Sequence, residues 1–143
     1  MIMNLERAIE IAVTAHKGQV DKSGAPYILH PLRVMLSLES EEERIVAVLH
    51  DVVEDSEDWP LDRLLAEGLP EGLATALDSV TRNDDETYME FIERSKTNAI
   101  GRRVKAADLR DNMDLSRIES PTEKDHRRTE KYRRALARLS EEA

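Results

Sequence analysis

Four ionisable residues stand close together near the middle of the sequence: His50, Asp51, Glu54 and Asp55. If this stretch is helical, His50 and Glu54 lie one turn apart, and so do Asp51 and Asp55. The residues around them are apolar, so this end of the helix is expected to pack inward, where a charge must be paired or bound to a metal ion. The plainer interpretation is a helix that becomes polar on leaving the core. The sequence leaves both interpretations open.

A second histidine, His30, precedes Pro31, a residue suited to the first turn of a helix. His30 could be a simple helix cap. It could also join His50 and Asp51 as a metal ligand, but this group would still lack ligands, so a further segment is required.

The stretch from Lys105 to Asn112 supplies that segment. Lys105, Asp108 and Asn112 follow an i, i+3, i+7 spacing and share one face of a predicted helix. Such residues do not suit a core, so this face is expected to line a polar cavity, unless it is simply exposed to solvent. The candidate ligands are then His30, His50, Asp51 and Asp108. Two imidazoles and two carboxylates favour Mn²⁺ or Fe²⁺, and zinc is not excluded by ligand type.

The elements that position these residues are predicted to be helices throughout. Apolar residues recur at spacings of three and four, and no window sustains the alternation of a strand. Asn4 is an expected N-cap, Ser40 and Glu43 are an expected capping box, and residues 18–26 read as a loop. Helices are expected at residues 5–16, from His30 onward, across 45–53, and at about 61–66, 70–80, 86–96, 100–115 and 122–142. The sequence therefore predicts an all-α fold, with residues 1–143 forming one compact bundle of six to eight helices.

Composition excludes several classes of protein. The chain has 143 residues, with 21 Lys and Arg against 30 Asp and Glu and a net charge of −9. It has no cysteine, which excludes disulfides, thiolate metal sites and a cysteine nucleophile. No apolar run is long enough to span a membrane, and we expect neither a secretory signal nor a membrane partner. An acidic chain so poor in aromatic residues is also not expected to bind nucleic acid. We therefore expect a cytoplasmic protein.

Four motifs occur in order along the chain: AHKGQ at 15–19, KSGAPYILHP at 22–31, HDVVED at 50–55, and KAAD at 105–108 followed by Asn112 and Met113. This arrangement resembles the HD metal-dependent phosphohydrolases, and within them the RelA/SpoT-type branch with its single-domain small alarmone hydrolases. The resemblance implies an all-α HD fold. It also implies removal of the 3′-pyrophosphate of guanosine tetra- or pentaphosphate, ppGpp and its relative, by a Mn²⁺ bound to His30, His50, Asp51 and Asp108.

The resemblance also assigns roles to the other motif residues. Glu54 is expected to orient or deprotonate the attacking water, with Asp55 supporting it. The expected substrate contacts are Lys22, Ser23, Lys105 and Asn112. The partner is a small nucleotide, and the oligomeric state is left open.

Three positions depart from the family pattern. Asp21 stands where an Arg is usual, Leu109 where Arg or Lys is usual, and Asp114 where Arg is common. These changes remove three positive charges and add two negative ones around the expected nucleotide site. The residues considered as possible compensation are Arg102, Arg103 and Arg110.

Two further functions stay open beside hydrolysis of guanosine tetraphosphate. One is an HD phosphohydrolase acting on another nucleotide phosphoester, and the other is a catalytically weakened metal-binding module. An interaction protein docking through its charged C-terminal helix has no specific motif behind it. Tyr132, Leu136 and Leu139 are expected to pack that helix onto the bundle. Of the remaining histidines, His16 is expected to be structural and His126 solvated.

Overall fold

The computed structural model describes residues 2–141, which are helical apart from loops and one isolated bridge between Val20 and Pro26. The predicted all-α fold is confirmed. In chain order the elements are α1 (Leu5–His16), α2 (Leu29–Leu36), α3 (Glu41–Leu49), α4 (Val52–Asp55), α5 (Leu61–Ala66), α6 (Glu71–Ser79), α7 (Tyr88–Lys96), α8 (Ala99–Asn112), the 3₁₀ turn η1 (Leu115–Arg117) and α9 (Glu123–Ser140). The bundle has eight helices within 2–141 if α3 and α4 are taken as one interrupted helix. The end predicted for the last helix, residue 142, lies outside the described range.

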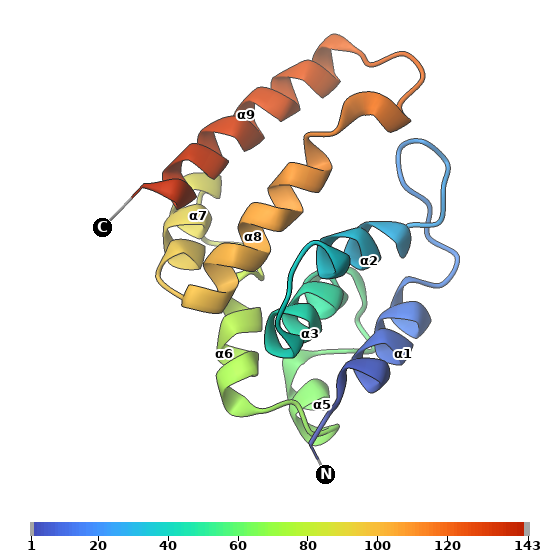
Figure 1. Ribbon diagram of the computed structural model, residues 1–143, viewed down its shortest axis with the longest axis vertical. Coiled ribbons are helices and arrows are strands. Elements are labelled where there is room, and N and C mark those ends of the chain that lie inside the picture. The colour runs from blue at the N-terminus through green and yellow to red at the C-terminus, as the bar shows by residue number, and fades with distance from the viewer. Residues whose placement is uncertain (1, 142–143) are drawn as a thin grey trace.

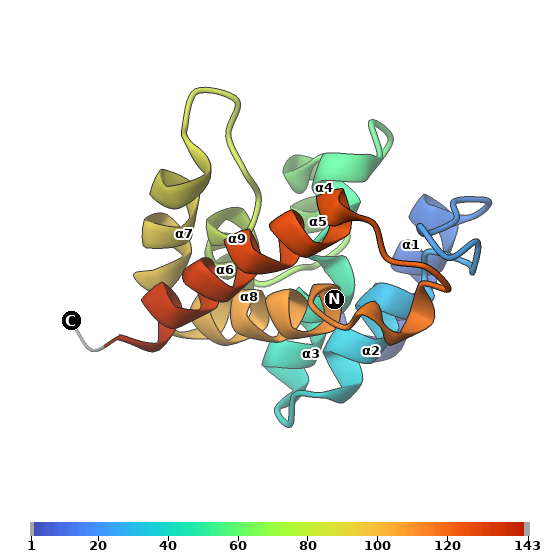
Figure 2. The ribbon, with the colours of Figure 1, turned by 90° about the horizontal axis from the view of Figure 1, so that it is seen from above.

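Helix α3 lies at the centre of the arrangement, with α1 and α2 on one side and α8 on the other (Figure 1). Helix α9 runs along α8 and also contacts α7. Seen from above, α8 and α9 remain side by side, and α1 lies beyond α2 as seen from α8 (Figure 2). Three separate stretches of the chain, carrying α2, α3 and α8, therefore meet at one place.

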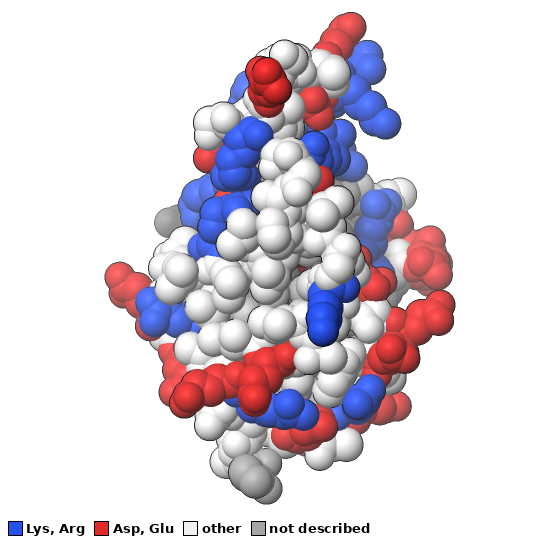
Figure 3. All heavy atoms as spheres, turned by 90° about the vertical axis from the view of Figure 1, so that its right-hand side faces the viewer, with Lys and Arg blue, Asp and Glu red and all other residues white. Residues whose placement is uncertain are grey.

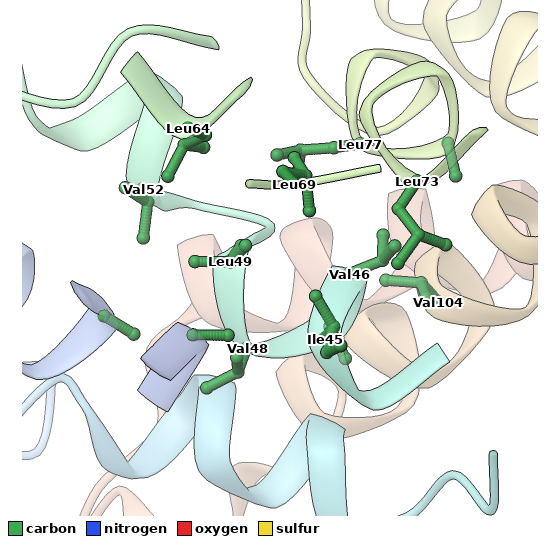
Figure 4. Packing of buried hydrophobic residues seen from close by; sticks show 14 of the residues in the cluster. Ile45, Val46, Val48, Leu49, Val52, Leu64, Leu69, Leu73, Leu77 and Val104 are labelled. Atoms are coloured by element: carbon green, nitrogen blue, oxygen red, sulfur yellow. The ribbon is translucent and has the colours of Figure 1, made fainter. Parts of the chain in front are cut away.

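The main core surrounds α3. Its residues 45 to 49 are all buried, so this helix is apolar around its whole circumference over more than one turn. Figure 4 shows Val46 facing Leu73 and Val104, with Leu49 directed toward Val52 and Leu64. Because the C-terminal end of α3 is enclosed, the residue that follows it, His50, is also buried.

A smaller core fixes the C-terminal helix. Ala135 and Leu139 of α9 pack with Ile92 of α7 and Leu109 of α8, and Tyr132 and Leu136 cover the edge of this cluster. The predicted packing of this helix is therefore confirmed. Leu109 is fully buried here, so this departure from the family pattern belongs to the core and not to a nucleotide pocket.

The single helix predicted across residues 45–53 is wrong. Helix α3 ends at Leu49, and α4 begins at Val52 after a turn formed by His50 and Asp51. The His50 ring donates from Nδ1 to the carbonyl oxygen of Ala47 at 2.6 Å, and Asp51 has φ −103° and ψ −3°, away from ideal helical values. The two polar pairs therefore do not lie on neighbouring positions of one continuous helix.

Only half of the predicted capping box at α3 forms. The Ser40 hydroxyl accepts from the Glu43 amide at 3.1 Å, but the Glu43 carboxylate binds Arg103 at 2.9 Å. An ion pair to another helix competes for this carboxylate. Complete capping boxes occur instead at α7, from Thr87, and at α9, from Thr122.

The surface on the right-hand side of Figure 1 is seen face-on in Figure 3. Charged residues of both signs lie mainly at its margins, and uncharged residues fill the band between them (Figure 3).

Among the helices of residues 2–141, none is long and apolar enough to cross a membrane.

Candidate metal centre

Four side chains predicted as ligands meet between α2, α3 and α8. His30 lies in the first turn of α2, His50 and Asp51 form the turn after α3, and Asp108 is on α8. His30, His50 and Asp108 are each at most 4% exposed. Asp108 Oδ1 lies 2.9 Å from His30 Nε2 and 3.1 Å from His50 Nε2. Asp51 Oδ2 lies 3.1 Å from His50 Nε2 and 3.8 Å from His30 Nε2.

Both imidazole rings are oriented by a hydrogen bond on their outer side. His30 donates from Nδ1 to Asp111 Oδ2 at 2.6 Å, and His50 donates from Nδ1 to the Ala47 carbonyl at 2.6 Å. A carboxylate and a carbonyl can only accept, so Nδ1 carries the proton in both rings. In the neutral rings each Nε2 then presents a lone pair to the centre. This is the outer hydrogen bonding typical of metal-ligating histidines.

Asp108 is held from the other side by residues of its own helix. Lys105 donates from Nζ to Asp108 Oδ2 at 2.8 Å, and Asn112 donates to Oδ1 at 3.1 Å. Burial alone would raise the pKa of Asp108, but Lys105 and the histidines outweigh it and hold this pKa well below its ordinary value. Asp108 is therefore a carboxylate, with Oδ1 turned toward the two imidazoles.

The histidines carry the complementary shift. Burial opposes the charged form of His50, yet the carboxylates of Asp51 and Asp108 raise its pKa well above the ordinary value. The pKa of His30 is also raised, because its hydrogen bonds to Asp108 and Asp111 outweigh desolvation. Burial would raise the pKa of Asp51, but the charge of His50 lowers it to about 2. The centre is thus arranged to hold positive charge between its carboxylates.

The arrangement fits a divalent cation. An ion about 2.1 Å from its ligands separates adjacent octahedral ligands by about 3.0 Å. Three of the four nitrogen–oxygen separations in the cluster are 2.9 to 3.1 Å, and the fourth is 3.8 Å. The lone pairs of two neutral imidazoles and two carboxylates would repel one another without a cation or protons between them. His30, His50 and Asp51 alone already form a group that could hold a metal ion.

Glu54 and Asp55 lie on α4, the short helix that begins directly after the predicted ligand Asp51. Glu54 accepts from the backbone amide of Arg82 at 2.5 Å, and this bond ties α4 to the loop between α6 and α7. Both carboxyl groups have a raised pKa, for which desolvation is the largest cause and the charge of Asp51 a further one. Two carboxyl groups with raised pKa values beside a metal-type cluster suit proton transfer.

A pocket of about 270 Å³ adjoins the centre and is called the adjoining pocket below. The predicted ligand His30 and its neighbour Tyr27 line it, together with the loop at residues 21–23 and residues of the C-terminal helix. The predicted substrate contacts Lys22, Ser23 and Asn112 line it, whereas Lys105 does not. In this structure the side chains of Lys105 and Asn112 are both engaged with Asp108.

The sequence predicted a shortage of positive charge around the nucleotide site, and the lining of this pocket corrects that prediction. Asp21 lines it, but its carboxylate accepts from Ser23 and from the Ala25 amide and so closes the loop. Asp114 also lines it and pairs with Arg117 at 3.1 Å. Arg102, Arg103 and Arg110, which were considered as a source of compensating positive charge, do not line this pocket, because they project from another face of α8. The basic side chains that do line the pocket are Lys22, Arg33, Arg117 and Arg128.

Several residues of the site were missed by sequence reasoning. Tyr27 donates from its hydroxyl to Asp51 Oδ2, and Asp111 binds both His30 and Arg33. Tyr27 is part of the matched motif at residues 22–31, so the sequence could have indicated that it lies near the site. Arg128 and Tyr132 line the adjoining pocket from α9. The sequence indicated only a charged helix with an apolar seam there, because it does not show which helix face meets the site.

Comparisons with known proteins agree with this geometry. No family model matches the chain. It is 44% identical over 57 residues to the guanosine-3′,5′-bis(diphosphate) 3′-pyrophosphohydrolase of Aquifex aeolicus, which is 37% of this chain and 8% of that protein. It is 36% identical over 83 residues to the protein of the same name from Borreliella burgdorferi, covering 55% of this chain and 12% of the relative. Over these segments the chain is similar to proteins named as 3′-pyrophosphohydrolases of guanosine-3′,5′-bis(diphosphate). It spans only about a tenth of the length of these relatives.

Similarity in fold to a solved structure extends over almost the whole chain. The solved structure of a metazoan ortholog of SpoT, described as hydrolysing ppGpp, superposes with a TM-score of 0.74 at 20% sequence identity. The superposition covers 94% of this chain and 84% of the other. The predicted HD-type fold is therefore confirmed.

Proposed function

We propose that the chain is a Mn²⁺-dependent phosphohydrolase that removes the 3′-pyrophosphate of guanosine tetra- or pentaphosphate. The observation that carries the proposal is the convergence of His30, His50, Asp51 and Asp108, with the imidazole Nε2 atoms directed inward. The mixed nitrogen and oxygen donors favour Mn²⁺ or Fe²⁺ over a structural zinc ion. The similarity to two 3′-pyrophosphohydrolases supports the substrate class.

In this proposal the four ligand residues hold one divalent cation, which supplies Lewis-acid polarisation of a phosphoryl oxygen and activates water. Glu54 accepts the proton of the water that attacks the phosphorus atom. The Arg82 amide fixes the direction of its carboxylate. Asp55 assists this proton transfer from the next position of α4. The bond from phosphorus to the 3′ oxygen breaks and pyrophosphate leaves. The 3′ oxygen takes up a proton from solvent, so the other product is a nucleoside 5′-di- or triphosphate with a free 3′ hydroxyl.

The adjoining pocket is proposed to receive the nucleotide. Lys22 and Ser23 contact the nucleotide from the loop, and Lys105 and Asn112 contact it beside the metal after exchanging part of their bonding to Asp108. Arg33, Arg117 and Arg128 supply further positive charge at the pocket wall. Tyr132 offers an aromatic surface, on which a base can stack. We propose that residues 1–143 act as one such domain, and cytoplasmic location and oligomeric state stay predictions.

A specific observation favours keeping a second candidate. Asp21 faces the pocket where the family has an Arg, so the chain could act on a nucleotide phosphoester with fewer charges. The test is a product assay with the Mn²⁺-loaded protein on guanosine tetraphosphate and on nucleotides with a 2′- or 3′-phosphate. Pyrophosphate released from the tetraphosphate supports the first function. Phosphate alone, released only from the other nucleotides, supports the second, and no product from any of them indicates a weakened metal-binding module.

A further inference from the structure

A second cavity, of about 670 Å³, opens on the side of α8 that faces away from the metal centre. We call it the reverse-face groove. It lies between one face of α8, along residues 99–110, and the end of α7, the C-terminal end of α9 and the connection from α2 to α3. Its volume lies within the range of about 300 to 1,000 Å³ that is usual for small-molecule sites.

The reverse-face groove is separate from the metal centre. At about 100° per residue, Ala99, Ala106 and Arg110 stand roughly 160° to 180° around α8 from Asp108. The groove and the adjoining pocket share no lining residue. A ligand in the groove would therefore meet a different set of side chains from those proposed to bind the substrate.

The groove is basic in an acidic protein. Four of its ten lining residues are Lys or Arg and none is Asp or Glu, although the whole chain has 30 acidic and 21 basic residues. Lys96 and Arg110 form no ion pair with any residue of the described range 2–141. The carboxylate nearest Lys96 in sequence, Glu93, pairs with Arg138.

The other two basic residues have partners that still leave charge in the groove. Arg103 binds Glu43 at 2.9 Å, but its side chain remains 60% exposed. Arg102 donates to the carbonyl oxygens of Leu139 and Glu141 at 2.5 and 2.7 Å. These are neutral acceptors, so the guanidinium charge is not cancelled by a carboxylate. Arginine binds phosphate oxygens in a bidentate manner, so such a set suits a ligand with several phosphate oxygens.

The groove is also lined by uncharged side chains, which together are called its floor. Leu38, Ala99, Ala106 and Leu139 line the groove between them. We propose that the reverse-face groove is a second nucleotide site, which binds a nucleoside diphosphate. Lys96, Arg103 and Arg110 bind the diphosphate, and the nucleoside lies on Leu38 and Ala106. Free pyrophosphate shares the diphosphate chemistry but would leave this floor uncovered, so it is expected to bind more weakly.

The test is calorimetric titration of EDTA-treated protein with GDP and, separately, with pyrophosphate. The double variant Lys96→Glu, Arg110→Glu is compared with Lys17→Glu, Arg127→Glu, which makes the same charge change at exposed residues outside both cavities. We expect the groove variant to bind GDP at least about 10-fold more weakly at the groove and the control to bind within about 2-fold of wild type. The pair Lys96→Ala, Arg110→Ala repeats the comparison if charge reversal lowers the melting temperature.

Hydrogen exchange on the same samples assigns the signal to a site. GDP is expected to protect residues 96–103 and 137–141 in the wild type and in the control but not in the groove variant. Protection restricted to residues 21–33 and 128–132 would assign all binding to the adjoining pocket and overturn the proposal. Unchanged affinity in both groove variants would overturn it as well. Equal affinities for GDP and pyrophosphate at the groove would overturn the nucleoside assignment.

Discussion

His30 and Asp111 are joined by a hydrogen bond of 2.6 Å, on the side of the imidazole ring opposite the Nε2 atom that faces Asp108. Asp111 is in turn held by Arg33 through bonds of 2.8 and 3.1 Å. Burial would raise the pKa of Asp111, but His30 and Arg33 outweigh it and lower this pKa. A charged carboxylate therefore sets both the tautomer and the direction of His30.

Replacement of Asp111 is expected to weaken metal binding without removing a ligand. Asp111→Ala frees the His30 ring, and loss of such an outer partner lowers metal affinity about 10- to 100-fold. Asp114→Ala is the matched control, because Asp114 pairs with Arg117 and makes no contact with a ligand histidine. Mn²⁺ titration of EDTA-treated proteins measures both. Equal affinity in the two variants would remove Asp111 from the account.

The backbone amide of Arg82 offers a way to test the position of Glu54. Arg82→Pro removes the N–H that Glu54 accepts, whereas Arg82→Ala keeps it and removes only the side chain. We expect Arg82→Pro to lower turnover at least about 10-fold, with Arg82→Ala close to wild type. Glu54→Gln should lower turnover by about 10²-fold or more, the usual scale of a lost general base.

Metal affinity and melting temperature are the controls for this series. Both should stay near wild type in Glu54→Gln, since Glu54 is not a proposed ligand. If Glu54→Gln turns over as fast as wild type, Glu54 is not the base, whatever the result at Arg82.

The charge of Asp21 can be separated from its role in the loop. Asp21→Asn keeps an oxygen that accepts from the Ser23 and Ala25 amides, but it removes the negative charge. Asp21→Ala removes both. We expect Asp21→Asn to lower KM for guanosine tetraphosphate several-fold, because repulsion falls while the loop persists. Asp21→Ala should raise KM, since the loop that presents Lys22 loses its closure. A KM for Asp21→Asn equal to that of the wild type would show that the charge has no part in substrate selection.

The sequence predicted the helices well because their patterns are local. Asn4 caps α1 as expected, and the helix at residues 61–66 has the predicted bounds. The turn at His50 and Asp51 was missed because both residues are compatible with a helix, and the cause is a side-chain bond to Ala47 within a buried site. The charge around the adjoining pocket was also misjudged. Arg33, Arg117 and Arg128 come from three separate elements, and only tertiary packing determines which helix faces meet.

Substitution of Leu139 tests how much the smaller core, which attaches α9 to the bundle, contributes to stability. Leu139 is 1% exposed and packs with Ile92, Leu109 and Ala135. Leu139→Ala should lower the free energy of unfolding by about 2 to 5 kcal/mol, the usual cost of a large cavity in a core. Leu136→Ala, at a half-buried position on the same helix, should cost less. Chemical denaturation measures both, and equal stability of Leu139→Ala and wild type would show that α9 is an appendage.

We propose that one metal ion, held by His30, His50, Asp51 and Asp108, is required for release of pyrophosphate from guanosine tetraphosphate. The direct measurement is a Mn²⁺ titration of EDTA-treated protein in which bound Mn²⁺ and pyrophosphate release are followed together. We predict about one tightly bound ion per chain, activity rising in proportion to it, and loss of both in Asp108→Ala. Pyrophosphate release by the metal-free protein would show that the reaction needs no metal ion, and wild-type Mn²⁺ affinity in Asp108→Ala would show that Asp108 is not a ligand.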